Sequence, residues 1–210
     1  MDVLLTDGNE RATLAAARSL VQAGYTVAVT ANRRFSLAGV SSGVRRVRVS
    51  AGPLADPVAY ATEVGAAARR LRARAVVPGT DASVEALLGH RDALPKAIVL
   101  PLPDRSAYRK ASDKAAMLDA ARRAGLAVPE TIVLQSPDEA LPDARFFPAV
   151  VKPHRSVALG QHFDVSFFAS VDSCRAALRA LPRSAFPVLL QRGVRGTGEG
   201  LVVLRGYGRT

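Results

Sequence analysis

The first hundred residues alternate short apolar runs with longer helical patterns. The run VLL at residues 3–5 precedes RATLAAARSLVQAG, where Leu14, Ala17 and Val21 recur at helical spacing and Gly24 ends the helix. A second strand is predicted at YTVAVTANR, and helix, strand, helix and strand are then predicted at PVAYATEVGAAARRLRA, AVVPG, SVEALLGHRDAL and AIVLPLP. This alternation predicts an α/β domain with a Rossmann-like parallel sheet that helices cover on both faces.

One segment of this half has a different pattern. In GVRRVRVS, Val47 and Val49 alternate with Arg46 and Arg48. A period of two with one charged side is typical of a half-exposed strand, so we expect this segment at an edge of the sheet.

The pattern changes after the proline-rich stretch PLPDRS at residues 101–106, and we place a domain boundary there, between 1–103 and 104–210. A helix, SDKAAMLDAARRAG, is expected to begin at a Ser112 cap and to end at Gly125. Strands are predicted at VPETIVLQ, FPAVVKP, HFDVSFFAS and FPVLLQRGV, with DSCRAALRALP as a helix before the last of them. Several strands with few helices predict a small α+β lobe with an antiparallel sheet.

Composition excludes several classes of protein. The 210 residues are 49% apolar, which is enough for a packed core, and no run approaches the roughly 18 apolar residues that cross a bilayer. The first residues contain acids where a signal peptide has bases, so we expect a cytoplasmic protein without a membrane partner. Cys174 is the single cysteine, which we interpret as a buried bystander thiol.

The net charge of +11 would attract an anionic partner such as nucleic acid. The arginines are spread through the predicted helices, however, and aromatic residues make up 5% of the chain, with no tryptophan to stack on bases. We therefore expect no nucleic-acid partner. Because the chain uses arginine so freely, its few lysines, Lys96, Lys110, Lys114 and Lys152, are candidates for specific roles.

The sequence contains no Walker A, HExxH or GxSxG motif, and the loop TDGNER has a single glycine, so the dinucleotide-binding fingerprint is absent. Asp7, Asn9, Thr80 and Asp81 follow predicted strands, where open α/β sheets bind ligands. The same positions suit helix caps, which is the interpretation we favour.

Five segments together resemble the ATP-grasp ligases, particularly the branch of predicted carboxylate-amine ligases. VLLTDG and AVVPGTDAS are similar to the domain that precedes the nucleotide-binding lobe, and SDKAAMLDAARRAGLAVPET to its Asp-Lys helix. FPAVVKP resembles the strand that presents a second lysine, and FPVLLQRGVRGTGEGLVVL the hinge and glycine turn. The resemblance implies a Rossmann-like pre-ATP-grasp domain followed by an ATP-grasp lobe.

A site for ATP requires cationic donors for the phosphates and an apolar slot with backbone donors and acceptors for adenine. Lys114, in the first turn of its helix, and Lys152, at a strand end before Pro153, could point into one cleft. The resemblance implies that both contact the phosphates. It also implies that backbone groups of Arg192 and Val194 pair with adenine, while Gln191 ends the supporting strand.

Two further segments carry candidate contacts. The loop HRSVALGQ, with Ser156 and Gly160, either folds over the phosphates or is a plain hairpin, and the sequence leaves both open. The resemblance implies a ribose contact at Glu199, although a solvated turn carboxylate is the interpretation we favour.

The chain departs from the family pattern at the hinge and at its end. Arg192 and Gly193 stand where the family usually has a glutamate and an aromatic residue. The magnesium ligands of the family have no counterpart before Thr210. The resemblance implies an ATP- and Mg²⁺-dependent ligase that activates a small-molecule carboxylate as an acyl phosphate. We expect this chain to be its ATP-binding portion, incomplete and inactive without a C-terminal lobe; the alternative is a non-catalytic nucleotide-binding or regulatory module.

Overall fold

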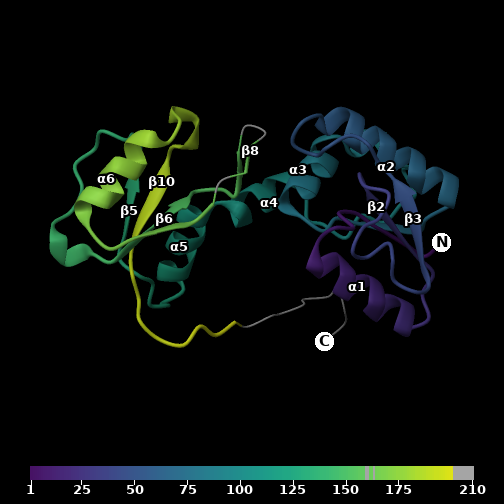
Figure 1. Cartoon of the computed structure of the whole chain (residues 1–210), viewed down its shortest axis with the longest axis horizontal. Coiled ribbons are helices and arrows are strands. Elements are labelled where there is room, and N and C mark those ends of the chain that lie inside the picture. The colour runs from purple at the N-terminus through teal and green to yellow at the C-terminus, as the bar shows by residue number, and fades with distance from the viewer. Residues whose placement is uncertain (159–160, 163, 201–210) are drawn as a thin grey trace.

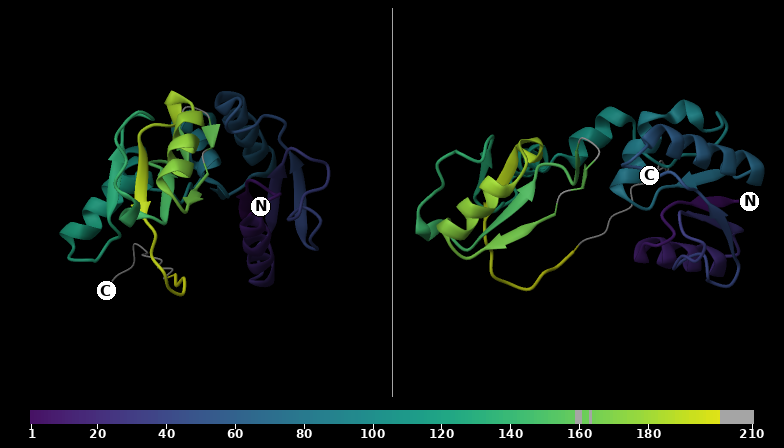
Figure 2. Two further views of the ribbon diagram at one scale, coloured as in Figure 1. Left: turned by 60° about the vertical axis from the view of Figure 1, so that its left-hand side comes forward. Right: turned by 45° about the horizontal axis from the view of Figure 1, so that its top comes forward.

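The protein is built on two separate four-stranded sheets. The computed structural model describes residues 1–158, 161–162 and 164–200. The two sheets lie side by side, each with helices of its own, and α4 (Arg105–Ser112) runs between them (Figures 1 and 2). We call the part built on the first sheet the first lobe and the part built on the second sheet the second lobe.

The first lobe is a parallel α/β unit, as the sequence predicts. Its strands are β1 (Val3–Leu5), β2 (Val27–Ala31), β3 (Val44–Arg48) and β4 (Ala75–Val77). Its helices are α1 (Arg11–Gln22), α2 (Pro57–Leu71), α3 (Asp81–Gly89) and the 3₁₀ turn η1 (Arg91–Ala93). The strand order is β3-β2-β1-β4 with parallel pairing throughout, so the arginine-rich β3 is an edge strand, as its pattern predicts.

Helices cover both faces of this sheet because neighbouring strand residues point to opposite sides. Leu5 belongs to a buried cluster with Ala17 of α1, while Leu4 belongs to another with Val64 of α2 and Leu87 of α3. Figure 1 shows α1 below the strands and α2 and α3 above them. Full burial of each such leucine stabilises the fold by about 1.5–3 kcal/mol.

The strand predicted at AIVLPLP is wrong. This segment contributes a single bridge to β4, at Val99, whose N–H donates to Arg74 O at 2.9 Å and whose carbonyl accepts from Val76 N–H at 2.9 Å. Pro101 and Pro103 follow at once and have no N–H to donate, so the ladder cannot continue.

The second lobe contains the predicted antiparallel sheet. Its strands are β5 (Thr131–Leu134), β6 (Ala149–Pro153), β9 (Ser166–Phe168) and β10 (Val188–Arg192), in the order β5-β10-β6-β9. A small hairpin is formed by β7 (Val157–Ala158) and β8 (Gln161–His162). The helical elements are α5 (Lys114–Arg123), α6 (Val171–Ala180), η2 (Ala144–Phe146) and η3 (Arg183–Ala185).

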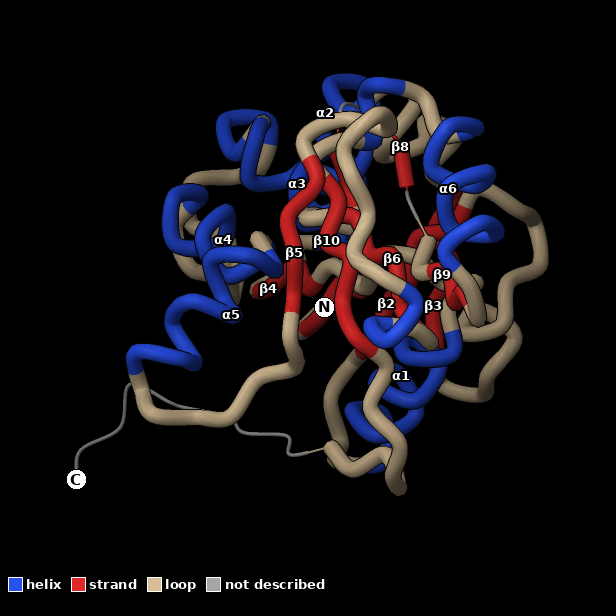
Figure 3. Tube along the Cα trace, turned by 90° about the vertical axis from the view of Figure 1, so that its left-hand side faces the viewer, coloured by secondary structure: helices blue, strands red, loops and turns tan. Residues whose placement is uncertain are grey.

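One face of this sheet forms the core of the second lobe. Val151 and Leu190 cluster there with Leu178 and Cys174 of α6. Burial raises the pKa of the Cys174 thiol, as expected of an inert buried cysteine. In Figure 3, α6 lies to one side of these strands and α4 and α5 to the other.

The predicted cap of the Asp-Lys helix is off by one residue. Ser112 ends α4, and Asp113 caps α5, where its Oδ1 accepts from the N–H groups of Ala115 at 3.0 Å and Ala116 at 3.1 Å. A carboxylate is favoured at this position because it also offsets the positive end of the helix dipole. The predicted stop signals hold: Gly24 and Gly125, at the ends of α1 and α5, have positive φ values of 87° and 77°.

No helix in the described ranges is long and apolar enough to cross a membrane.

Candidate functional site

Lys152 lies at the start of a chain of side-chain hydrogen bonds across the second sheet. Its Nζ donates to Gln191 Oε1 at 2.7 Å, and Gln191 Nε2 donates to Thr131 Oγ1 at 3.0 Å. The three residues come from β6, β10 and β5, and Gln191 pairs directly with Thr131 in the strand register. The chain of bonds fixes the amide orientation of Gln191 and directs its oxygen to the lysine.

The alternation of the strands explains why these polar groups meet. Val151 and Leu190 face the core under α6, so Lys152 and Gln191, the next residues along their strands, face the opposite side. Gln191 is buried, with 8% of its surface exposed, whereas Lys152 is half-buried. The sheet therefore presents one lysine on a face that also holds an amide hydrogen-bonded through both its oxygen and its nitrogen.

Lys114 is tied to the segment that follows Lys152. Its backbone N–H donates to His154 O at 2.8 Å, and its Nζ donates to Ser156 Oγ at 3.1 Å. Arg155, between these two residues, donates from Nη2 to Arg109 O of α4 at 3.3 Å. These contacts hold residues 154–156 against the junction of α4 and α5.

The start of α5 offers side chains rather than open backbone donors. The N–H of Lys114 is taken by His154, and those of Ala115 and Ala116 are taken by the Asp113 cap. A phosphate group near this helix would therefore be bound through the ammonium of Lys114 and the hydroxyl of Ser156.

The pKa of Lys114 lies below its usual value. Burial is the largest cause, since it disfavours the charged form, and the positive charge of Lys152 lowers the pKa further. Asp81 and Asp113 oppose this shift through their negative charges. The charge of Lys152 therefore acts on the Lys114 amine.

The hinge residues lie at and beyond the end of β10. The N–H of Arg192 donates to Glu130 O at 2.9 Å, and its guanidinium faces the Glu130 carboxylate at 3.5 Å on the surface. The N–H of Gly193 donates to Pro148 O at 2.7 Å. Val194 and Glu199 are exposed. Among the described residues, no hydrogen bond or ion pair joins either of them to Lys114 or Lys152.

The structure gives a reason for glycine at position 193, where the resembled family usually has an aromatic residue. A Cβ at this position would lie 2.7 Å from the backbone oxygen of Pro148. Real Cβ atoms do not approach a carbonyl oxygen so closely. Any other residue at position 193 would therefore displace the end of β10 or the start of β6.

The loop after Lys152 contains the small hairpin β7–β8, which leaves both interpretations of HRSVALGQ open. Gly160 lies outside the described residues. Ser156 precedes the hairpin and already accepts the hydrogen bond from Lys114.

The polar residues at the strand ends of the first lobe serve the fold. Asp7 Oδ1 accepts from Ser83 Oγ at 2.7 Å, and Oδ2 accepts from Thr6 Oγ1 at 2.6 Å and Gly79 N–H at 3.0 Å. Thr80 caps α3 by accepting from Ser83 N–H at 3.2 Å, as we expected.

The other residues of that set are not caps. Asp7 links β1 to the start of α3, and Asn9 donates to Asn32 at 3.3 Å. Asp81 is the first residue of α3 and accepts from Tyr108 OH at 3.4 Å, so it joins α3 to α4.

A cavity of about 450 Å³ lies where the two lobes meet. Its walls come from the loop after β3, from α3 and α4, and from residues 154–157 and 184–186. Lys114 and Lys152 are not among its lining residues.

Sequence reasoning missed Thr131, Arg105 and Arg109. Thr131 orients Gln191 only because β5 pairs with β10, a register that no local pattern reveals. Arg105 and Arg109 line the cavity because α4, which was not predicted as a separate helix, places both on one face at a spacing of one turn.

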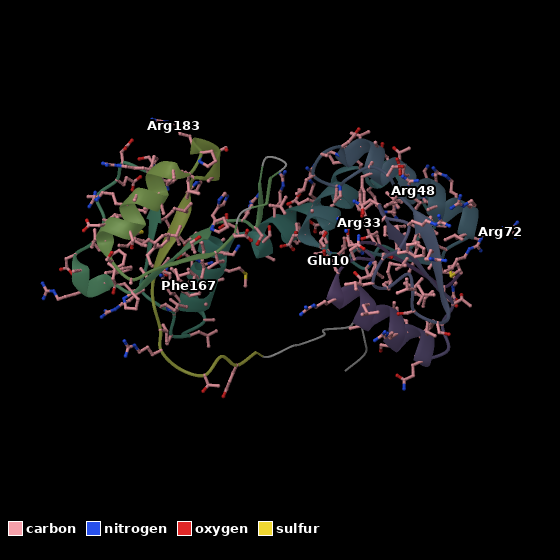
Figure 4. The ribbon with its side chains drawn as sticks, in the orientation of Figure 1. Glu10, Arg33, Arg48, Arg72, Phe167 and Arg183 are labelled. Atoms are coloured by element: carbon pink, nitrogen blue, oxygen red, sulfur yellow. The ribbon has the colours of Figure 1, made fainter. Side chains whose placement is uncertain are left out.

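Arginines lie on both lobes. Figure 4 shows Arg183 on the second lobe and Arg33, Arg48 and Arg72 on the first. This arrangement agrees with the interpretation of the charge as solvated arginine on many surfaces.

The described residues contain no group of three or more His, Cys, Asp or Glu side chains that could hold a metal ion. The two carboxylates whose charges act on Lys114 accept hydrogen bonds from other groups. Asp113 caps α5, and Asp81 accepts from Tyr108 OH.

Solved structures with the same fold are known. An L-amino acid ligase from Bacillus licheniformis superposes with a TM-score of 0.65 at 15% identity, over 93% of this chain and 45% of its own. N5-carboxyaminoimidazole ribonucleotide synthetases from Thermus thermophilus and Aspergillus clavatus superpose with TM-scores of 0.58 and 0.56 at 18% and 16% identity. These matches cover 92% of this chain and 47% of each synthetase, and the Aspergillus structure is a complex with ATP.

At these identities the comparison establishes the fold. The chain has the fold of ATP-grasp carboxylate-amine ligases, which confirms the resemblance seen in the sequence at that level. It spans slightly less than half the length of these proteins. No protein-family model matches the sequence, and no curated protein matches it either.

Proposed function

We propose that this chain is the nucleotide-binding portion of an ATP-dependent carboxylate-amine ligase. The observation that carries the proposal is the convergence of two lysines on one environment, Lys152 on the face of the second sheet and Lys114 at the start of α5. The fold shared with ATP-grasp enzymes, one of them a complex with ATP, supports the same function.

The two ammonium groups would bind the phosphates. Each has three N–H donors, and each donates to a neutral side-chain oxygen, Gln191 Oε1 or Ser156 Oγ. A phosphate oxygen is a stronger, charged acceptor, so it would replace or join these neutral partners. Gln191 would keep its bond to Thr131 and hold the strand end in place.

Adenine would lie beside the hinge. Because the N–H groups of Arg192 and Gly193 already bind Glu130 and Pro148, we assign the adenine edge to the carbonyl of Arg192 and the N–H of Val194. Gly160 would lie in the loop over the phosphates, and Glu199 would contact the ribose, as the sequence resemblance implies.

In the complete reaction, the terminal phosphate of ATP would pass to a small-molecule carboxylate, and an amine would then displace phosphate from the acyl phosphate. The lysines would stabilise the charge on the transferred group. The resemblance implies magnesium, which would offset the charge of the phosphates; the described residues contain no group of three or more His, Cys, Asp or Glu side chains to hold it. The proposal also includes a domain division near residues 103 and 104, a contribution from a further C-terminal lobe and a cytoplasmic location.

The test is ATP binding by titration calorimetry with the variants Lys152→Ala and Lys110→Ala. Lys152→Ala should weaken binding by about 1.5–3 kcal/mol, because a charge-assisted hydrogen bond is lost. Lys110, an exposed lysine in α4, serves as the matched control and should have no effect. Equal ATP affinity in the wild type and the Lys152 variant would refute the proposed site.

A second measurement separates a ligase from a nucleotide-binding module. We expect this chain alone to bind ATP without sustained ADP release when carboxylates and amines are added. Carboxylate-dependent ADP release that Lys152→Ala abolishes would show that the chain is catalytically sufficient.

A further inference from the structure

The cavity between the two lobes is lined by an excess of positive charge. Arg105 and Arg109 reach it from α4, and Arg155 reaches it from the segment after β6. His90 and His154 also line it, and Glu85 is its one acidic lining residue. Its volume of about 450 Å³ lies in the range of small-molecule sites.

These arginines lack acidic partners in the part of the chain that the structure describes. The ion pairs there join Arg74 to Asp2, Arg122 to Asp119, Arg145 to Asp143 and Arg192 to Glu130. None of these pairs involves Arg105, Arg109 or Arg155, and Glu85 forms no ion pair among them. The cavity wall therefore carries three arginines and one glutamate, with no ion pair between them among the described residues.

Arg155 carries a second, independent indication. Among the described residues, its Nε is the buried side-chain nitrogen or oxygen atom that has no hydrogen-bond partner. Its Nη2 donates to Arg109 O at 3.3 Å, while the buried Nε–H has no acceptor. A buried unsatisfied donor costs about 1–3 kcal/mol, so the hydrogen-bonding capacity of this guanidinium is not met by the protein itself.

We propose that this cavity is a second ligand site, which binds a small oxyanion bearing phosphate or carboxylate groups. Guanidinium groups suit this ligand because their planar donors match the two oxygens of a phosphate or carboxylate. The site is distinct from the proposed nucleotide site, since neither Lys114 nor Lys152 lines it, and it does not rest on the proposed function.

Binding here would join parts of both lobes. The ligand would bridge α4 and the segment of residues 154–157, which also provides Ser156, the acceptor for Lys114. The bound anion would thereby fix the segment that borders the nucleotide site.

The test is calorimetric titration of the full chain with inorganic pyrophosphate and, separately, with citrate. We expect binding that Arg155→Gln and Arg105→Gln each weaken about tenfold or more. Arg105 is exposed and should tolerate substitution, so this variant remains informative if Arg155→Gln fails to fold. Arg70→Gln, on the exposed side of α2, removes the same charge outside the cavity and should have no effect.

The Lys152→Ala variant separates the two sites. Anion binding that persists in this variant supports the cavity, whether or not ATP binds elsewhere. Binding of pyrophosphate alone would identify a phosphate ligand, and binding of citrate alone a carboxylate ligand. The proposal is overturned if neither anion binds, if Lys152→Ala abolishes binding, or if Arg70→Gln weakens it as much as the cavity variants do.

Discussion

The strand ends of the first lobe and the sheet face of the second lobe both gather polar side chains, but they pair them differently. In the first lobe, one carboxylate, Asp7, accepts from Thr6, Gly79 and Ser83, and Tyr60 OH reaches the same serine at 2.8 Å. In the second lobe, Lys152 and Lys114 donate to neutral oxygens of Gln191 and Ser156.

The difference separates polar groups that stabilise the fold from polar groups that can bind a ligand. The acceptor capacity of Asp7 is used by donors of its own lobe, and a ligand there would have to break existing bonds. An ammonium group with three donors and a neutral partner gains when a phosphate oxygen arrives. The usual expectation that an open α/β sheet binds its ligand at the strand ends therefore does not apply to the Asp7 cluster.

The largest expected effect tests the first half of this comparison. Asp7→Ala should lower the free energy of unfolding by about 3 kcal/mol, because it leaves three donors without their charged acceptor. Urea denaturation followed by circular dichroism measures this. Asp2 lies just before β1 and accepts from Thr26, but its side chain is 29% exposed, so Asp2→Ala should have a smaller effect. Similar losses in the two variants would show that the Asp7 cluster contributes no more than a surface bond.

The next effect concerns the backbone of the hinge. Gly193→Ala should lower the free energy of unfolding by about 1–3 kcal/mol, since the new Cβ would press on Pro148 O and separate β10 from β6. A methyl group added at Gly198 would meet no atom within 4 Å beyond its chain neighbours, so Gly198→Ala is the matched control and should be neutral. Thermal unfolding of both variants provides the comparison, and an unaffected Gly193→Ala would contradict the close approach.

Local sequence patterns predicted most elements because each pattern depends on a few neighbouring residues. The Leu14, Ala17 and Val21 stripe packs on the first sheet, and the alternating arginines of GVRRVRVS mark an edge strand, as expected. The errors arose where a single residue decides between two local outcomes. Asp113, and not Ser112, caps α5. Pro101 ends the pairing of Val99 with β4 after one bridge.

The candidate site could be predicted only in part for a related reason. Lys114 and Lys152 were selected from sequence because lysine is rare here and both lie at element ends. Their partners depend on strand register, as Thr131 does with Gln191, or on chain packing, as Ser156 does with Lys114. The arginine-lined cavity arises from segments around residues 53, 85, 105, 155 and 184, which no sequence pattern brings together.

A smaller effect tests the second half of the comparison. Lys152→Ala should lower the free energy of unfolding by about 1 kcal/mol, because it leaves only Gln191 Oε1 without its donor. The same variant should lose more ATP affinity than stability, the opposite of Asp7→Ala. Urea denaturation and calorimetry on one preparation give both values. A stability loss as large as that of Asp7→Ala would mean that Lys152 is a structural residue.

The smallest expected effect is a pH dependence of ATP affinity that originates at Lys114. Burial and the charge of Lys152 lower the pKa of Lys114 below its ordinary value of 10.5, so the free protein begins to lose this charge at a lower pH than an exposed lysine does. Bound phosphate favours the protonated amine, so the complex retains the proton to a higher pH. ATP binding therefore takes up a proton between the two pKa values, and affinity must fall as the pH rises through that window.

Arginine at the same position provides the control, because a guanidinium remains charged throughout this range. ATP titrations at about pH 8 and about pH 9.5 should show a decline of less than tenfold in the wild type and a shallower decline in Lys114→Arg. The slope is the readout, since the larger arginine can change the affinity itself at both pH values. Calorimetry in buffers of different ionisation enthalpy measures proton uptake directly, and Lys114→Arg should reduce it. Equal slopes and equal proton uptake in the two proteins would place Lys114 outside the phosphate site and leave Lys152 as its single lysine.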